Sequence, residues 1–278
     1  MTDAIKISGL NKTFGSFSLR DIDLEIPRGF IVGMIGENGA GKSTLIKCIT
    51  GAIIPDSGDV RVSVDEPGDI GIVFDDCHLP MNLNTEQIGR LMASMFRNWD
   101  QARYDSLIDE YGLDRDKKIS TFSRGMKMKM QVAVALSHNP RILILDEPTA
   151  GMDPAARDEF LDLVMGYIQD ENHTVLISSH ITSDLEKVAD YIVFIHKGRI
   201  LISDEKDAIL ERYGLVKCGR EDFDRLDKES IVSHRDGDVV VTALTNDKQG
   251  MREAYPELVV DDATLDDIMV MIVRGVRE

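Results

Sequence analysis

The chain has 278 residues, of which 43% are hydrophobic and 29% are charged, and this suits one large domain with a small appendage or two modest domains. The formal net charge of -17 argues against binding DNA or RNA over a broad surface, because phosphate neutralisation needs clustered cations. The longest apolar stretches are strand-sized and fall short of the roughly 20 residues that span a bilayer, and the first residues lack the pattern of an export signal.

The first 205 residues alternate predicted strands and helices. Strands are expected at 19–26, 30–35, 70–74, 142–145, 175–178 and 191–195. Helices are expected at 42–49, 86–96, 104–111, 124–137, 154–169 and 182–189. This order predicts an α/β fold with a parallel sheet, interrupted by a helical insertion at roughly 76–139.

The character of the sequence changes near residue 205, and the segment that follows is acidic, with 17 acidic against 11 basic residues from Lys206 onward. A helix is expected at 205–213, a strand at 239–243 and a helix at 263–274. We therefore predict two domains, one over 1–205 and a small α+β domain over 206–278.

A glycine-rich loop follows the expected strand 30–35 and opens the next helix. It comprises Gly36, Glu37, Asn38, Gly39, Ala40, Gly41, Lys42, Ser43 and Thr44. The spacing fits G-x-x-x-x-G-K-[ST], whose backbone N–H groups and helix N-terminus cradle phosphates. In this pattern Lys42 reaches the β- and γ-phosphates and the hydroxyl of Ser43 ligates Mg²⁺. The loop therefore predicts a binding site for a nucleoside triphosphate.

The apolar strand 142–145 ends in two carboxylates, Asp146 and Glu147. In a sheet that also carries a phosphate loop, the first carboxylate can hold Mg²⁺ and the second can orient or deprotonate the attacking water. Alone the pattern is weak, because solvated acids often end a strand.

Three further runs complete a family pattern: Ser123-Arg124-Gly125-Met126 before a long helix, 146–153 with the sequence DEPTAGMD, and Ser178-Ser179-His180. In order and spacing the chain resembles the nucleotide-binding domain of bacterial ABC transporters over roughly 1–205. The resemblance implies an ATPase with a P-loop sheet and an antiparallel β edge near the N-terminus.

The same resemblance implies roles for single residues. Phe14 lies where an aromatic ring stacks on adenine, although a core phenylalanine is the alternative. Ser123 and Gly125 match the signature that contacts the γ-phosphate of ATP on the opposite subunit, so the site is shared across a dimer. Asp153 matches the loop that communicates across that dimer, and His180 matches the histidine that contacts the γ-phosphate. Lys42, Ser43 and Thr44 hold the phosphates and Mg²⁺, with Asp146 supporting Mg²⁺ and Glu147 as the general base.

Two departures from the family pattern stand out. The signature is usually Leu-Ser-Gly-Gly-Gln, whereas here it is Phe-Ser-Arg-Gly-Met over 122–126, which resembles a subgroup of exporter ATPases. After the strand 70–74 the usual glutamine is replaced by Asp75. A carboxylate approaches Mg²⁺ more strongly than an amide does, so Asp75 is a candidate metal ligand. A solvated acidic turn is the alternative.

These features predict an ATP-hydrolysing subunit that powers transport, with a lean towards export of a drug, peptide or similar compound. The expected partners are a separate membrane permease and a second nucleotide-binding subunit, identical or different. The three cysteines lack metal or disulfide spacing, which favours reduced thiols. The expected location is cytoplasmic, on the inner face of the cell membrane through the permease. The alternative is a soluble ABC ATPase that acts as a nucleotide-gated clamp or regulator with little turnover.

Overall fold

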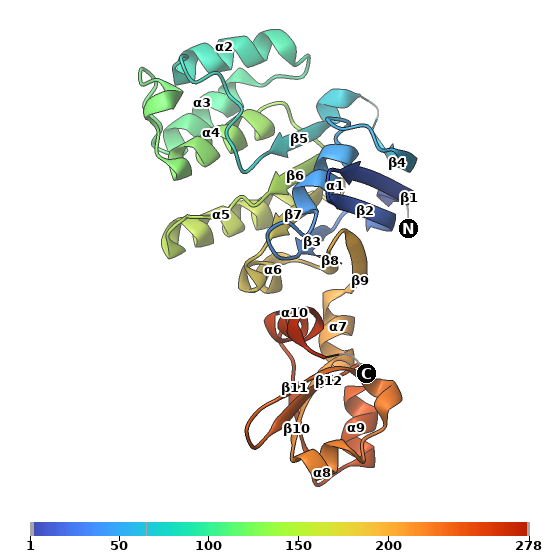
Figure 1. The fold of residues 1–278 in the computed structure, drawn as a ribbon. Coiled ribbons are helices and arrows are strands. Elements are labelled where there is room, and N and C mark those ends of the chain that lie inside the picture. Colours follow the sequence, from blue (N-terminus) through green and yellow to red (C-terminus); the bar gives the residue numbers. More distant parts are fainter. Residues whose placement is uncertain (1–2, 65, 277–278) are drawn as a thin grey trace.

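The computed structural model describes residues 3–64 and 66–276, and its centre is a six-stranded sheet (Figure 1). The strand order is β5-β6-β7-β3-β8-β9. The strands are β5 (Ile70–Val73), β6 (Ile142–Asp146), β7 (Thr174–Ser179), β3 (Ile31–Ile35), β8 (Tyr191–His196) and β9 (Arg199–Glu205). All neighbours are parallel except β8 and β9. The predicted parallel sheet is confirmed.

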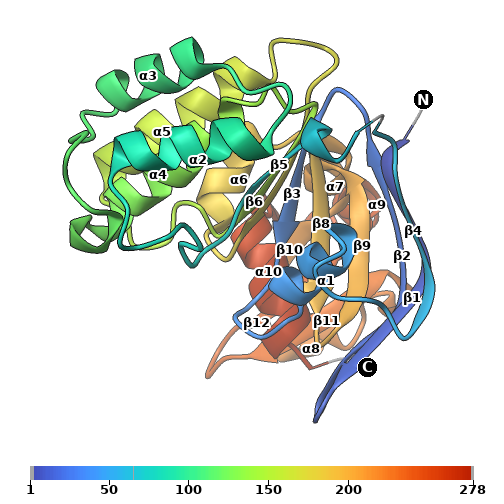
Figure 2. The same ribbon diagram turned by 90° about the horizontal axis from the view of Figure 1, so that it is seen from above.

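A second, antiparallel sheet lies against one face of the first (Figure 2). It has the order β2-β1-β4, with β1 (Asp3–Phe14), β2 (Phe17–Pro27) and β4 (Ser57–Val62). The β1–β2 hairpin reverses between Phe14 and Phe17. This sheet is the antiparallel edge that the resemblance implied.

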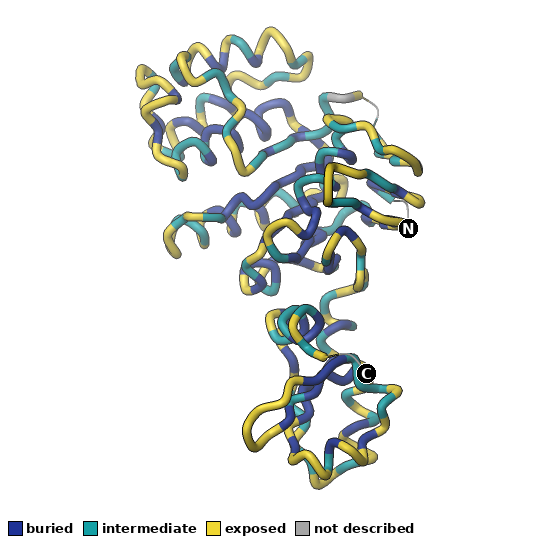
Figure 3. The backbone as a smooth tube through the Cα atoms, viewed as in Figure 1, coloured by how far each residue is buried: buried dark blue, intermediate teal, exposed yellow. Residues whose placement is uncertain are grey.

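Alternate side chains of the central strands face two different cores. In β6, Ile142 and Ile144 pack with the antiparallel sheet and α1 (Lys42–Ile49), whereas Leu143 and Leu145 pack with the other helices. Successive strand residues point to opposite faces, so burial on both faces explains the unbroken apolar runs of the sequence. β3, β6 and β7 are buried at every residue, and Figure 3 shows the middle of the sheet in dark blue.

The helices predicted between β5 and β6 are present and gather at one end of the molecule (Figure 1). They are α2 (Thr85–Met95), α3 (Gln101–Glu110) and α4 (Arg124–Leu136), while α5 (Pro154–Tyr167) and α6 (Thr182–Val188) flank the central sheet. The methionines of α4 alternate in sequence as in a strand, yet the segment is helical. Met128 and Met130 are buried there as packing residues.

The C-terminal part forms its own antiparallel sheet in the order β11-β12-β10-β13. In chain order the elements are α7 (Lys206–Arg212), β10 (Gly214–Cys218), α8 (Arg220–Phe223), β11 (Ile231–Asp236), β12 (Val241–Thr245), α9 (Lys248–Ala254), β13 (Val259–Asp262) and α10 (Leu265–Arg274). The strand predicted from residue 239 was placed two residues too early. Val239 and Val240 are exposed because they lie in the turn, where Gly237 N donates to Val240 O.

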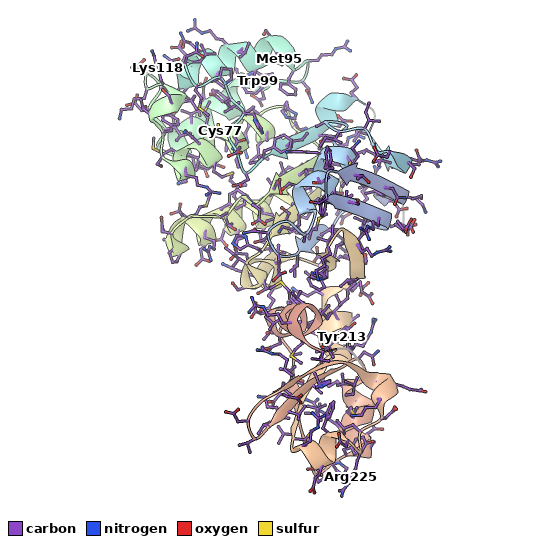
Figure 4. The ribbon with its side chains drawn as sticks, in the orientation of Figure 1. Cys77, Met95, Trp99, Lys118, Tyr213 and Arg225 are labelled. Atoms are coloured by element: carbon purple, nitrogen blue, oxygen red, sulfur yellow. The ribbon has the colours of Figure 1, made fainter. Side chains whose placement is uncertain are left out.

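The C-terminal elements sit on α6 through α10. The carboxylate of Glu186 in α6 accepts a hydrogen bond of 2.6 Å from the backbone N of Leu265, the first residue of α10. Thr182 Oγ1 donates to Asp266 Oδ1 over 3.3 Å. Figure 4 places Tyr213 at this junction and Arg225 at the far end of the C-terminal part. The C-terminal elements therefore pack against α6, which is the helix that follows His180 in the chain.

We expect Glu186→Ala to lower the free energy of unfolding by about 1 kcal/mol, because an N–H group at the start of α10 loses its partner. Urea unfolding followed by circular dichroism measures the change. Glu211→Ala, which removes an exposed glutamate of α7, is the matched control. Equal urea midpoints for the two variants would contradict the prediction.

Among residues 3–64 and 66–276, no helix combines the length and the apolar character needed to cross a membrane.

Candidate active site

The glycine-rich loop lies between β3 and α1, at the carboxyl end of the central sheet. At two positions of the loop glycine is required: a Cβ on Gly36 would lie 2.5 Å from Ile195 O, and Gly41 has a φ of 117°; Gly39 also has a positive φ, of 81°. Gly198 N donates to Ala40 O over 2.9 Å and ties the loop to the β8–β9 turn. The loop is thus fixed from both sides around the start of α1.

Lys42, the first residue of α1, folds back over this loop. Its Nζ donates to Gly36 O at 2.6 Å and to Glu37 O at 3.2 Å. It also lies 2.9 Å from Glu147 Oε1. The lysine is only 5% exposed, so its charge is held inside the site by carbonyls and one carboxylate.

Asp146 ends β6, which lies next to β7 in the sheet, and Glu147 is the residue that follows. The hydroxyl of Ser178 in β7 donates to Asp146 Oδ1 at 2.6 Å and accepts from the backbone N of Glu147 at 3.0 Å. Glu147 has a φ of 51°, a left-handed conformation that is unfavourable for a residue with a side chain. The bonds to Ser178 hold this strained turn and direct the Glu147 side chain towards Lys42.

His180 completes a line of three side chains. Its Nδ1 lies 2.6 Å from Glu147 Oε2, and its backbone N donates to the same oxygen over 3.3 Å. An ionised carboxylate only accepts hydrogen bonds, so Nδ1 carries the hydrogen. Lys42 and His180 therefore hold the two oxygens of Glu147 between them.

Burial by itself raises the pKa of Glu147, but the positive charge of Lys42 and the hydrogen bonds from Lys42 and His180 outweigh burial. The pKa of Glu147 therefore lies below its ordinary value of 4.5. A carboxyl group with a lowered pKa in the folded state stabilises the fold above its ordinary pKa, and this contribution disappears as the pH falls through the folded-state value.

This direction gives a pH prediction. As the pH falls from 7 through 4.5 and below, wild type is expected to lose more stability than Glu147→Gln, which has no carboxyl group to protonate. Thermal unfolding at a series of pH values measures the difference between the two proteins. A difference that stays constant down to the acid limit of folding would contradict it.

The signature residues lie at the start of α4, within the helical insertion. The hydroxyl of Ser123 caps the helix by accepting from Met126 N at 3.3 Å. The guanidinium of Arg124 pairs with the carboxylate of Asp75, which follows β5. Gln131 Nε2 donates to Phe74 O over 3.1 Å and ties α4 to β5 a second time. The described contacts of Asp75 are thus with the signature helix, whereas Asp146 and Glu147 contact β7 and Lys42.

Two predicted site residues lie apart from this line. Phe14 ends β1 and is 45% exposed, so it is not the core phenylalanine that the sequence left open. Asp153 caps α5 by accepting from Ala155 N and Ala156 N at 3.1 Å each. An exposed ring can stack on a base, and the cap fixes the loop between Glu147 and α5.

The donor set at Asp146 fits Mg²⁺. Asp146 is 3% exposed, and among the residues that the structure describes it has no ion-pair partner. A buried carboxylate without a cation is costly, and hard oxygen ligands are those that Mg²⁺ prefers. The phosphate-loop pattern predicts the hydroxyl of Ser43, one residue after Lys42, as a second oxygen ligand.

Two contacts in the site were not predicted from the sequence: the contact of Ser178 with Asp146 and the pairing of Arg124 with Asp75. Ser178 belongs to a recognised run, and its place beside Asp146 follows from the parallel register of β6 and β7. The contact of Ser178 with Asp146 could therefore have been predicted from the register of β6 and β7. Arg124 pairs across 49 positions with Asp75, and no local pattern indicates such a pair.

The sheet, the phosphate loop and the carboxylates at the end of β6 define a P-loop ATPase. A family model described as "ABC transporter" matches residues 19–150. The lantibiotic transport ATP-binding protein SrtF of Streptococcus pyogenes is 34% identical over 211 residues, covering 73% of this chain and 91% of SrtF. The daunorubicin/doxorubicin resistance protein DrrA of Streptomyces peucetius is 31% identical and covers 90% of this chain and 84% of DrrA.

Solved structures agree with these relatives. An ATP-binding subunit of an ABC transporter superposes with a TM-score of 0.67 at 27% identity, covering 74% of this chain and 91% of that one. A dimeric ATP-binding cassette with ADP and phosphate has a TM-score of 0.64 at 21% identity over 72% and 98% of the two chains, which shows the fold alone. The chain belongs to the ATP-binding subunits of ABC transporters, and its activity is ATP hydrolysis that powers transport through a separate permease.

Proposed function

We propose that two subunits of this kind close over two ATP molecules, that Glu147 activates the attacking water, and that the motion drives export of a peptide or drug. The observation that carries the proposal is the line from Lys42 through Glu147 to His180, at 2.9 and 2.6 Å. It joins a phosphate-binding cation to a general base and to the group that orients that base.

Binding of ATP would rearrange this line. The phosphates carry more negative charge than one carboxylate, so they would draw Lys42 Nζ away from Glu147 Oε1. The backbone N–H groups of 36–44 and the N-terminus of α1 would hold the remaining phosphate charge. Glu147 keeps His180, and its released oxygen is free to accept a proton from water. Phe14 would stack on adenine.

Mg²⁺ would be held by Ser43 and Asp146 and would neutralise charge on the phosphates. Asp75 remains a predicted third ligand, although its carboxylate is paired with Arg124 in this structure. Ser178 fixes the Asp146 carboxylate through its hydroxyl, which keeps one oxygen in a constant direction.

Ser123 and Gly125 would complete the site of the opposite subunit, with Asp153 at the same interface. The test is phosphate release with Mg-ATP over a range of protein concentrations. A specific activity that rises with concentration supports a site shared by two copies. A specific activity independent of concentration, in protein shown to be monomeric, would contradict it.

The permease contact is proposed at a hollow of about 510 Å³ beside Asp75. The hollow is lined by Asp75, Asp76, Cys77, His78, Met81, Arg124, Lys127, Met128 and Gln131. It lies between the core and the helical insertion, so a movement of one against the other would change the shape of the hollow. Export is favoured because SrtF and DrrA are described as lantibiotic transport and drug resistance proteins. The subunit would then lie at the cytoplasmic face of the membrane, with 1–205 as the ATPase domain and 206–278 as a separate small domain.

A further inference from the structure

Arg124 occupies the position next to Ser123, at the exposed start of α4. Its side chain is 55% exposed, and its guanidinium pairs with Asp75, which is 46% exposed. It also lies across Gly151: a Cβ on that glycine would be 3.4 Å from Arg124 Nη1 and 3.5 Å from Cδ. Arg124 therefore brings the signature into contact with the loop that ends at Asp153, and these are the two segments assigned above to the dimer interface.

The ion pair is not needed to hold α4 in place. Gln131, seven residues further along the helix and so on the same face, already joins α4 to the end of β5 through Phe74 O. An ion pair between half-exposed side chains contributes little to stability, since water solvates both charges well. The guanidinium can thus leave Asp75 at small cost.

A triphosphate is the stronger partner for this guanidinium. A phosphate group offers several charged oxygens, and arginine binds them through two parallel N–H donors. If Ser123 reaches the γ-phosphate on the opposite subunit, a guanidinium one residue along the chain lies within reach of the same phosphates. A single half-exposed carboxylate cannot compete with that charge.

We propose that Arg124 contacts the phosphates of ATP held by the opposite subunit when two copies close, and that Asp75 holds the guanidinium until then. The inference rests on the proposed shared site and adds a substrate-binding residue to it. Asp75 acts here as a positioning residue. The aspartate at the position of the usual glutamine thus accompanies an arginine in the signature, and the two side chains pair.

The two members of the pair then have opposite effects on dimer closure. Arg124→Ala removes a charge-assisted contact from each site, so the dimer should dissociate about tenfold more readily. Asp75→Asn keeps the size of the side chain but removes the competing charge, so the dimer should be as stable as the parent or more stable. If the ion pair between Arg124 and Asp75 instead served only to hold α4 against the end of β5, both substitutions would weaken the dimer to the same extent.

The experiment uses a Glu147→Gln parent, in which bound ATP is not consumed. Sedimentation gives the dimer dissociation constant at saturating Mg-ATP for the parent and for Arg124→Ala, Asp75→Asn and Lys127→Ala added to it. Lys127→Ala removes a cation from the same turn of α4 and serves as the matched control. A fluorescent ATP analogue measures nucleotide affinity in dilute, separated copies, and ADP replaces ATP in a parallel series.

The inference is supported if only Arg124→Ala weakens the ATP dimer, if Asp75→Asn does not, and if Arg124→Ala leaves the nucleotide affinity of separated copies unchanged. It is overturned if Arg124→Ala matches Lys127→Ala, or if both members of the pair weaken the dimer equally. If the parent itself does not dimerise with ATP, the shared site proposed above fails as well, and the two failures are thereby distinguished.

Discussion

Glu147→Gln is expected to lower the rate of ATP hydrolysis by about two orders of magnitude or more while ATP still binds. The substitution keeps the shape of the side chain and removes its capacity to accept a proton, and general base catalysis contributes about 10²–10⁴-fold to a rate. The lowered pKa of Glu147 keeps the wild-type carboxylate ionised at neutral pH, so the base is present in its active form. Phosphate release measures the rate.

The control for this variant is the binding of a fluorescent ATP analogue. Lys42 and the phosphate loop remain intact, so the affinity for nucleotide should stay equal to wild type or rise, because the Glu147 charge no longer competes for Lys42. Hydrolysis at the wild-type rate would show that another group activates the water.

Lys42→Ala is expected to weaken ATP binding by about tenfold to a hundredfold, the effect of losing a hydrogen bond to a charged group. Lys42 is buried at the start of α1, with its charge directed at the loop that should hold the phosphates. Equilibrium binding of the fluorescent analogue measures the loss. Lys47→Ala, a lysine in the last turn of the same helix, should bind as wild type does.

The same substitution also removes the cation beside Glu147, whose side chain is only 11% exposed. An unpaired buried carboxylate destabilises the fold, so reduced binding could reflect unfolding. The double variant Lys42→Ala with Glu147→Gln removes both charges and should recover stability without recovering affinity. Recovery of affinity in the double variant would contradict a direct role of Lys42 in phosphate binding.

The sequence predicted those parts of the fold that depend on neighbouring residues. The helix 42–49 and the strand 142–145 could be read from local periodicity, and the glycine-rich loop marked the junction between strand and helix. The structure has the helix at the predicted bounds and extends the strand by one residue. Lys42 and Glu147 meet because β3 and β6 both lie beside β7, which the alternation of strands and helices predicted only in outline.

What the sequence did not predict depends on pairing between distant residues. The strands β1 and β4 pair through Ile5 and Val62, 57 positions apart, and the register of such a pair leaves no local pattern. The contact of Arg124 with Asp75 is of the same kind. The strand predicted over 239–243 was wrong in its bounds, because the apolar valines that suggested it begin in the turn before β12.

Mixing two inactive variants tests whether each ATP site is completed by two subunits. Glu147→Gln lacks the base, and Ser123→Asp keeps the helix cap but places a negative charge against the γ-phosphate. Each variant should be inactive alone. An equimolar mixture should recover about a quarter of the wild-type rate, because half of the randomly formed dimers are mixed and each holds one intact site. A mixture that stays as inactive as its components, while wild type hydrolyses ATP, would contradict the shared site.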